Sequence, residues 1–405
     1  MARGHGKPPH HPGEPGDSGE ESSRTGGFVG VTVATAATVA GVTPPFLIGG
    51  LSVFMGPDLG FDEAGLGLAV SFFFTLAAIL SVPAGWLGDR LGARRALRIS
   101  MTVSMFGLVG IGAVAQSLPV LMAFMAFGAL GNAMAQTAGN ALILATTPYR
   151  RQAISFAVKQ SAAPFANLAG GAAVPLVGLT IGWRWAFFAT AVLCLLMFVR
   201  MPAGTIVAAA GTGAIRKMPL VVLAAAAACA TAAANASGAF LVPALVAEGS
   251  EPGPAGVVLA VGGVVGIAVR MISGWSADRF KMDSLLVATL LVASGVVGMI
   301  IMALGPDGPG LLLAVVLIFG GGWGFNGLLV FAVTRSYPLA PARATGMTQT
   351  GVFAGGVFGP SLFALAATTS GYPVAWLTAA ALAFAATVFF AVGRLMLRRH
   401  QGRGA

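Results

Sequence analysis

The sequence predicts an all-α membrane protein with twelve transmembrane helices, arranged as two parallel six-helix bundles. Three observations support this prediction: the low charge content, the long apolar runs and an internal repeat. Of the 405 residues, 57% are hydrophobic and only 9% are charged. About a quarter of the residues of a soluble globular domain are charged, so this chain has too few for a water-facing surface of its size. Lipid is therefore the expected solvent for most of it.

Twelve apolar segments are long enough to cross a ~30 Å hydrocarbon core as helices. Strands without partners are excluded, because every backbone N–H and C=O inside lipid must be satisfied within its own segment. The predicted spans are residues 27–53, 64–84, 96–115, 119–146, 153–180, 183–200, 218–246, 255–274, 284–304, 310–333, 345–369 and 373–395.

The composition between these spans divides the chain into parts. Residues 1–26 are rich in Pro, Gly, Ser and charge and contain no apolar region of a signal peptide, which predicts a disordered tail. Residues 27–200 form the first bundle, 201–217 a linker, 218–397 the second bundle, and 398–405 a short tail. A monomer is expected.

The basic residues between the spans predict the orientation. All Lys and Arg residues of the connections lie on one side, except Arg184, whereas Asp58, Asp62, Glu63 and Glu248 share the side of Arg184. Connections rich in Lys and Arg face the cytoplasm, so both termini are expected inside. The short loops favour a bacterial inner (cell) membrane. The net charge of +10 then reflects the orientation of the protein in the membrane. The basic residues are scattered over short loops, which argues against nucleic-acid binding.

The chain repeats itself with an offset of 189 residues. This register pairs Gly85 with Gly274, Trp86 with Trp275, Asp89 with Asp278, Arg90 with Arg279, Gly131 with Gly320, Gln160 with Gln349 and Gly182 with Gly371. Six spans per half is an even number, so the two halves have the same orientation. Such a repeat implies similar bundles with a pathway between them.

The stretch "GWLGDRLGARR" at residues 85–95 resembles the signature G-x-L-x-D-R-x-G-R-[RK]-x of the major facilitator superfamily, and "GWSADR" at 274–279 is its copy. It departs from the signature at Ala93. The resemblance covers residues 27 to about 397. It implies a secondary transporter whose signature acids close the cytoplasmic side. Asp89 would face the helix that begins near Thr345, and Asp278 the helix that begins near Gln152; Arg90, Arg94 and Arg279 complete the predicted gate.

A carboxylate at a helix N-terminus gains about 0.3–2 kcal/mol from the unpaired N–H groups and the helix dipole, a size that suits a switch. The alternative is that this charge only marks the cytoplasmic side, with a tight glycine turn.

Two cations lie within the predicted spans. Lys159 and Arg270 are costly there and are expected to face a cavity. Several organic-anion carriers of the superfamily have an Arg at a similar place in span 8. The resemblance therefore implies that Arg270 binds a carboxylate, with Lys159 as a second positive point. The alternative is that both side chains reach the cytoplasmic headgroups.

Polar side chains in the spans predict the lining of the substrate pathway. Asn132, Gln136 and Asn140 recur every four residues, so they share one helical face. A polar face within a membrane points into protein or water. Further polar contacts are expected from Asn235, Trp323, Asn326, Gln160 and Gln349. The alternative is helix–helix hydrogen bonding, worth about 0.6 kcal/mol each.

Glycine and proline predict where helices approach closely or bend. Gly351, Gly355 and Gly359 form a smooth face for close packing, and Pro164 permits a bend in its span.

The residue inventory excludes several functions. No constellation for catalysis, metal binding or a cofactor lies in the spans, and "GGGWG" at 320–324 lacks the context of a nucleotide loop. No Asp or Glu lies in any span. Span 4 has Phe127 where many proton-linked drug exporters of the superfamily carry an Arg. The favoured function is a secondary transporter of a small organic anion, such as a monocarboxylate, working by alternating access. The alternatives are an exporter of drug-like or biosynthetic hydrophobic compounds and a non-transporting membrane sensor.

Overall fold

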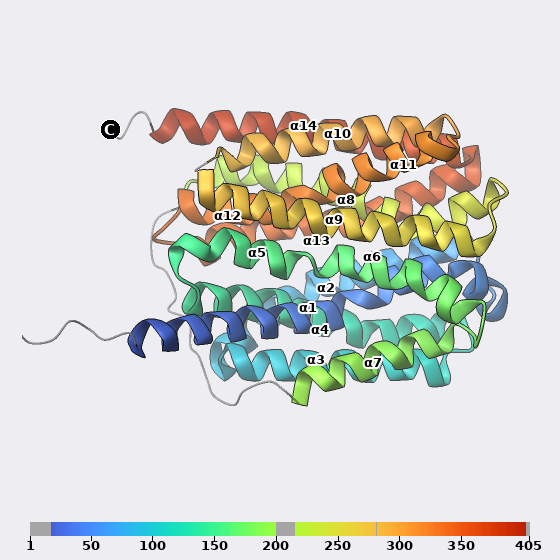
Figure 1. The fold of residues 1–405 in the computed structure, drawn as a ribbon, viewed down its shortest axis with the longest axis horizontal. Helices are drawn as coiled ribbons and strands as arrows, with labels where there is room; N and C mark the ends of the chain where they lie inside the picture. The colour runs from blue at the N-terminus through green and yellow to red at the C-terminus, as the bar shows by residue number, and fades with distance from the viewer. Residues whose placement is uncertain (1–17, 200–214, 281, 402–405) are drawn as a thin grey trace, which may run out of the picture.

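The computed structural model of the protein describes residues 18–199, 215–280 and 282–401. Within these ranges, the side chains of residues 18–27, Val82, Asp89, Tyr149, 341–343 and 399–401 lie outside the description. The described residues form helices and no strand, and the helices run roughly along the longest axis of the molecule (Figure 1).

The first half contains α1 (Ser18–Leu59), α2 (Glu63–Leu91), α3 (Ala93–Val114), α4 (Leu118–Thr146), the 3₁₀ turn η1 (Tyr149–Arg151), α5 (Gln152–Gln160), α6 (Ala162–Ala173), the π-helical η2 (Val174–Gly178) and α7 (Arg184–Val199). The second half contains α8 (Lys217–Ala247), α9 (Pro252–Phe280), α10 (Ser284–Ala303), α11 (Gly308–Val316), the π-helical η3 (Leu317–Gly322), α12 (Trp323–Ser336), α13 (Pro341–Ser370) and α14 (Tyr372–Gln401).

Ten helical segments of the described chain are long and apolar enough to cross a membrane. The two other predicted spans have a different form in the structure. Residues 152–178 are divided among α5, α6 and η2, and α7 has 16 residues up to Val199, where the first described range ends.

Several predicted helix ends are wrong. The structure begins α1 at Ser18, inside the segment 1–26 that the sequence predicts to be disordered. Extending a formed helix needs no new nucleation, so polar residues can continue it beyond the membrane. The signature stretch, expected as a loop, is also helical: α2 runs to Leu91 and α3 starts at Ala93. Only Gly92 turns the chain, with φ of 79°, a conformation that glycine adopts without steric cost.

Two spans predicted to be continuous are interrupted. The helix ends at Gln160 and restarts at Ala162. Pro164 has no N–H to donate to the carbonyl of Gln160, which explains why the helix is interrupted there. In the second half, the glycine-rich η3 separates α11 from α12. Such π-helical turns are frequent at functional sites, and this one immediately precedes Trp323.

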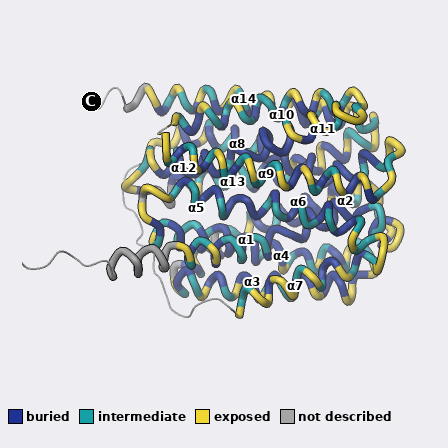
Figure 2. The backbone as a smooth tube through the Cα atoms, viewed as in Figure 1, coloured by how far each residue is buried: buried dark blue, intermediate teal, exposed yellow. Residues whose placement is uncertain are grey.

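Within each half, most of the closely packed helices are not consecutive in the chain, and a few helix pairs join the halves. In the first half, α1 packs against α4 and α6, and α3 against α4 and α7; in the second, α8 packs against α13 and α14. The halves meet where α2 contacts α13, α9 contacts α5 and α6, and α1 contacts α8. Buried residues concentrate where the helices face one another, while exposed residues recur along the outer faces of the helices (Figure 2). Exposed apolar side chains such as Phe106, Leu290 and Phe384 suit contact with lipid.

The glycine face predicted on α13 packs directly on the backbone of α8. A Cβ atom at Gly355 would collide with the carbonyl oxygen of Ala228 and would lie 2.8 Å from the backbone nitrogen of Ala232. Gly351 and Gly359 meet the carbonyls of Ala224 and Ala232 in the same way.

We expect Gly355→Ala to lower the stability of the protein, because adding a methyl group to such a contact costs about 1–3 kcal/mol. Thermal unfolding in detergent, followed by tryptophan fluorescence, measures this effect. Gly346→Ala is the matched control, since a Cβ atom at this position of the same helix would meet nothing within 4 Å. Equal melting temperatures for the two variants would contradict the packing described here.

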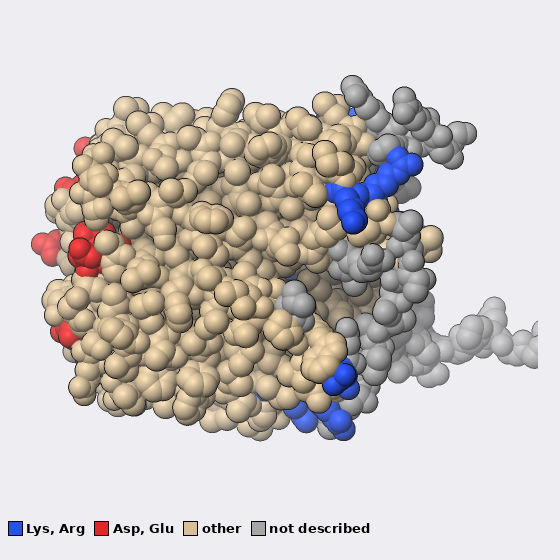
Figure 3. All heavy atoms as spheres, turned by 180° about the vertical axis from the view of Figure 1, so that it is seen from behind, with Lys and Arg blue, Asp and Glu red and all other residues tan. Residues whose placement is uncertain are grey.

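Most acidic and most basic residues gather at opposite ends of the molecule (Figure 3), although Arg184 pairs with Asp58 at 3.5 Å. We call one the acidic end, with Asp58, Asp62, Glu63, Glu248, Glu251 and Asp307, and the other the basic end, with Arg90, Arg94, Arg150, Arg279, Arg335 and Arg394. Asp283 ties α10 to α14 at the basic end, accepting from the Nε of Arg394 and pairing with Arg398, both at 2.6 Å. Burial acts to raise the pKa of the Asp283 carboxyl, but the two arginines outweigh it, and the pKa is lowered.

Candidate functional site: a central cavity between the two halves

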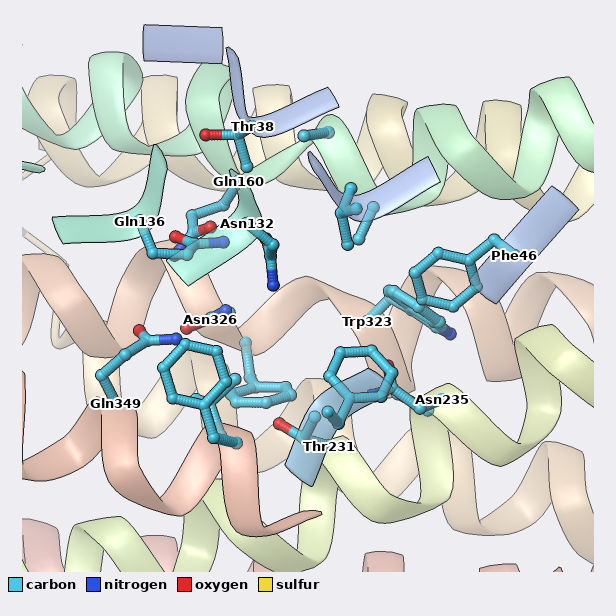
Figure 4. A pocket seen from close by; sticks show the side chains of 18 of the residues that line it. Thr38, Phe46, Asn132, Gln136, Gln160, Thr231, Asn235, Trp323, Asn326 and Gln349 are labelled. Carbon is cyan, nitrogen blue, oxygen red and sulfur yellow. The ribbon is translucent and has the colours of Figure 1, made fainter. Parts of the chain in front are cut away.

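A cavity of about 60 Å³ lies between the halves, and helices from both contribute to its wall (Figure 4). Polar side chains come from α1, α4, α5, α8, α9, α12 and α13. They are Thr38, Asn132, Gln136, Gln160, Thr231, Asn235, Arg270, Asn326 and Gln349. Aromatic rings complete the wall: Phe46, Phe74, Trp323, Phe325 and Phe353. The cavity is smaller than the roughly 300–1,000 Å³ of a typical site for a drug-sized ligand.

The polar face of α4 is divided between two tasks. Asn132 and Gln136 line the cavity, as the spacing predicts, whereas Asn140 is not part of its lining. Instead, Asn140 and Gln136 accept hydrogen bonds from Lys159, with distances from its Nζ of 2.8 Å and 2.6 Å. Lys159 is fully buried and also lies outside the cavity lining.

Arg270 is the charged residue among those that line the cavity. It is 3% exposed, and its Nε donates to the carbonyl of Trp323 at 2.7 Å. The indole of Trp323 packs edge-on against Phe46 at 5.3 Å and stacks on Phe319 at 6.3 Å between ring centroids. The guanidinium is therefore anchored at one end to a well-packed residue. Its Nη1 has no hydrogen-bond partner among the described residues.

Including this Nη1, six polar atoms of the cavity wall lack partners within the described part of the chain. The donors are Gln160 Nε2, Asn235 Nδ2, Arg270 Nη1 and Trp323 Nε1, and the acceptors are Asn132 Oδ1 and Asn326 Oδ1. Buried polar groups in native proteins normally have a partner from protein, water or ligand. Their convergence on one cavity indicates a site for a molecule that offers hydrogen-bond acceptors and some donors.

Apart from Trp323, the sequence did not predict which aromatic residues line the cavity. Phe46, Phe74, Phe325 and Phe353 stand in apolar runs, where an inward ring and a lipid-facing ring look the same. The sequence also did not predict that Thr38 and Thr231 line the cavity. A lone threonine in a membrane helix usually donates to the backbone of its own helix, as Thr38 does to the carbonyl of Ala34.

At the basic end, Asp278 connects the two halves. Its Oδ2 accepts from the backbone N–H of Ile154, in the first turn of α5, at 2.9 Å. Gly274, one turn earlier in α9, makes this approach possible, since a Cβ atom there would lie 2.6 Å from that of Ala157. Asp278 thus lies at the start of the helix that the predicted gate expects it to face.

The other predicted gate residues have different positions. Arg90 and Arg279 are exposed and lie over rings of their own helices: the guanidinium carbon is 3.5 Å from the ring centre of Trp86 for Arg90 and 5.8 Å from that of Phe280 for Arg279. Arg94 is half-buried in the first turn of α3. The side chain of Asp89 lies outside the described residues.

The two halves also touch toward the acidic end. The hydroxyls of Ser71 in α2 and Ser361 in α13 are 2.7 Å apart, and Tyr372 donates to Glu63 at 3.4 Å. Gly67 and Gly171 allow close contacts, the first with Ala364 of α13 and the second with the backbone of Ala260 in α9. The halves are therefore in contact at both ends of their interface.

Comparison with known proteins gives two matches. A family model described as "Major Facilitator Superfamily" matches residues 28–340, a range that holds every cavity-lining residue except Gln349, Val352 and Phe353. The chain is also similar to a protein of Streptomyces lividans described as a chloramphenicol resistance protein. The two are 30% identical over 345 residues, which cover 82% of this chain and 86% of the relative.

Proposed function

The chain belongs to the major facilitator superfamily, and from this premise we propose that it exports an uncharged, drug-like compound by alternating access. The compound would carry an aromatic ring and several hydrogen-bond acceptors, as chloramphenicol does. The single observation that carries this proposal is the cavity wall, in which aromatic rings surround polar atoms that have no partner among the described residues. This reverses the order of the two substrate classes favoured by the sequence.

The chemistry of the wall supports a neutral ligand with acceptors. Four of the unpaired atoms are donors and two are acceptors, so carbonyl, nitro or hydroxyl oxygens of a ligand would find partners. The rings offer stacking surfaces for an aromatic ligand. The S. lividans relative, named for chloramphenicol resistance, makes chloramphenicol the first compound to test.

An organic anion is the second candidate, and Arg270 is the observation that favours it. A guanidinium with a free Nη1 at the cavity wall suits a carboxylate. However, the predicted second positive point is missing from the wall, because Lys159 is held by Gln136 and Asn140 beside the cavity. One buried Arg without a second cation suits an acceptor group of a neutral ligand equally well.

We propose the finer architecture on the same premise. Residues 152–178 and α7 would complete the ten long segments to twelve spans. Residues 27–200 and 218–397 would form two six-helix bundles in parallel orientation, which the repeat of 189 residues supports. Connections rich in Lys and Arg face the cytoplasm, so the basic end and both termini would lie on the cytoplasmic side. The protein would act as a monomer in the cell membrane.

Counterflow in proteoliposomes tests this function and separates a transporter from a sensor. Vesicles loaded with unlabelled chloramphenicol are expected to take up labelled chloramphenicol faster than protein-free vesicles. Unlabelled benzoate, as an aromatic monocarboxylate, should compete poorly. Strong competition by benzoate without chloramphenicol exchange would replace the neutral substrate by the anion. If neither chloramphenicol exchange nor competition by benzoate is found, the result would favour a non-transporting membrane sensor.

A further inference from the structure

We propose that Lys159 is the group that carries the coupling proton, so that the protein exchanges a proton for its substrate. This inference rests on the proposed export function and names the ion that would drive it. It assigns to a lysine a task for which no predicted span offers a carboxylate.

The structure builds a closed compartment for the amine. Lys159 is 0% exposed although its side chain is ionisable, and its Nζ reaches only two described acceptors, the amide oxygens of Gln136 and Asn140. Gly139 lies between them on α4, and a Cβ atom there would lie 3.0 Å from Cε of the lysine. The α4 surface is thus shaped to admit this side chain.

The two acceptors can hold the side chain both as a neutral amine and as an ammonium. A neutral amine has two N–H donors, and both would be satisfied by Gln136 and Asn140. An ammonium has three donors, and the third has no partner in the described part of the chain. The same two amides therefore hold the side chain in both states, and only the charged state needs a further acceptor, such as water from an opened cavity.

The surroundings do not neutralise the charge. α4 (Leu118–Thr146) and α6 contain no charged residue, and the described side chains of α1 offer only Asp58, at the acidic end. α9 contributes Arg270, held by Trp323, and Asp278, held by Ile154. Arg150 and Arg151 of η1 are exposed and Arg335 of α12 lies at the basic end. Lys159 has no carboxylate within ion-pair distance among the described side chains. A buried cation without such a partner is costly, which favours release of its proton.

Gln136 links the amine to the substrate site, because it lines the cavity and also accepts from Lys159. In each cycle the amine would take one proton from outer water and release it to cytoplasmic water, while one substrate molecule leaves. No bond of the substrate changes. With an uncharged substrate, each cycle moves one positive charge inward.

The first test does not use a substrate. The chain has four lysines, Lys7, Lys159, Lys217 and Lys281, so protein labelled with ¹³C at the lysine ε-carbon gives few signals in detergent. Lys159→Met identifies the signal of Lys159. We expect that signal to change its protonation state within the pH range in which the protein stays folded, while the signal of exposed Lys217 stays protonated. A Lys159 signal that stays in one state throughout this range would overturn the proposal.

The second test measures coupling in proteoliposomes. With a lumen one pH unit more acidic than the bath and no membrane potential, one-to-one exchange should accumulate chloramphenicol about tenfold. In Lys159→Met and Lys159→Arg, uptake should no longer differ with and without the gradient, since neither side chain exchanges a proton. Lys217→Met is the matched control and should accumulate like the wild type.

The outcomes separate the two proposals. Gradient-driven accumulation that persists in both Lys159 variants, or counterflow without any gradient response in the wild type, overturns the proton site alone. A wild type without chloramphenicol counterflow overturns the proposed function, and the NMR titration then decides on the proton site.

Discussion

Replacing Arg270 by methionine is expected to weaken chloramphenicol binding by about 10- to 100-fold while leaving the protein at least as stable as the wild type. The free Nη1 of Arg270 lies at the cavity wall, and a hydrogen bond from a charged donor contributes about 1.5–3 kcal/mol. Methionine has a similar length, so it fills the space without the charge. Removing a buried charge for an apolar group of similar volume is often neutral or stabilising.

The opposite signs for affinity and stability make this prediction specific. Binding of labelled chloramphenicol to purified protein and thermal unfolding of the same samples give the two values. Arg150→Met is the matched control, because Arg150 is exposed in η1, outside the cavity, and should change neither. Unaltered affinity in Arg270→Met would remove Arg270 from the substrate site. Parallel loss of affinity and stability would assign it a structural role instead.

Arg270 and the α4 amides were predictable because membrane helices rarely contain such groups without a reason. A polar residue inside a long apolar run therefore identifies an inward face directly, and the spacing of four residues placed Asn132 and Gln136 together. The same logic predicted that Lys159 faces a cavity, but it lies beside the wall, held by Asn140. Sequence spacing predicts the face of a helix, whereas the partner of a long side chain depends on which neighbouring helix approaches.

Helix ends and interruptions were harder to predict than the spans themselves. Hydropathy ends a span where polar residues begin, but a helix continues as long as its backbone hydrogen bonds can form, as α2 does through the signature to Leu91. The π-helical turn at Leu317–Gly322 depends on packing of glycines against α10, where Gly321 meets the backbone of Leu291. Such contacts are tertiary and leave no local signal. Apolar lining residues such as Phe46 were unpredictable for the same reason.

Replacing Asp278 by alanine is expected to open the basic end of the protein. The carboxylate accepts from the N–H of Ile154 at the start of α5, across the interface of the halves. An anion in this position contributes about 0.3–2 kcal/mol, so its loss should change the ratio of closed to open forms by about 2- to 30-fold. A population that was small in the wild type would then become measurable.

Pulsed electron spin resonance measures this shift directly. Spin labels at Arg151 and Phe280, exposed residues at the basic ends of α5 and α9, report the separation of these helices, after Cys194 and Cys229 are replaced by serine. Asp278→Ala should add a longer distance to the distribution. Asp62→Ala is the matched control: Asp62 also accepts from a backbone N–H, that of Gly65 at 2.9 Å, but within its own helix end. Because that contact does not join the halves, the distance distribution should stay as in the wild type. Equal distributions for all three proteins would mean that the closed form does not depend on the Asp278 contact, and that the close packing of Gly274 on Ala157 holds α5 and α9 together without it.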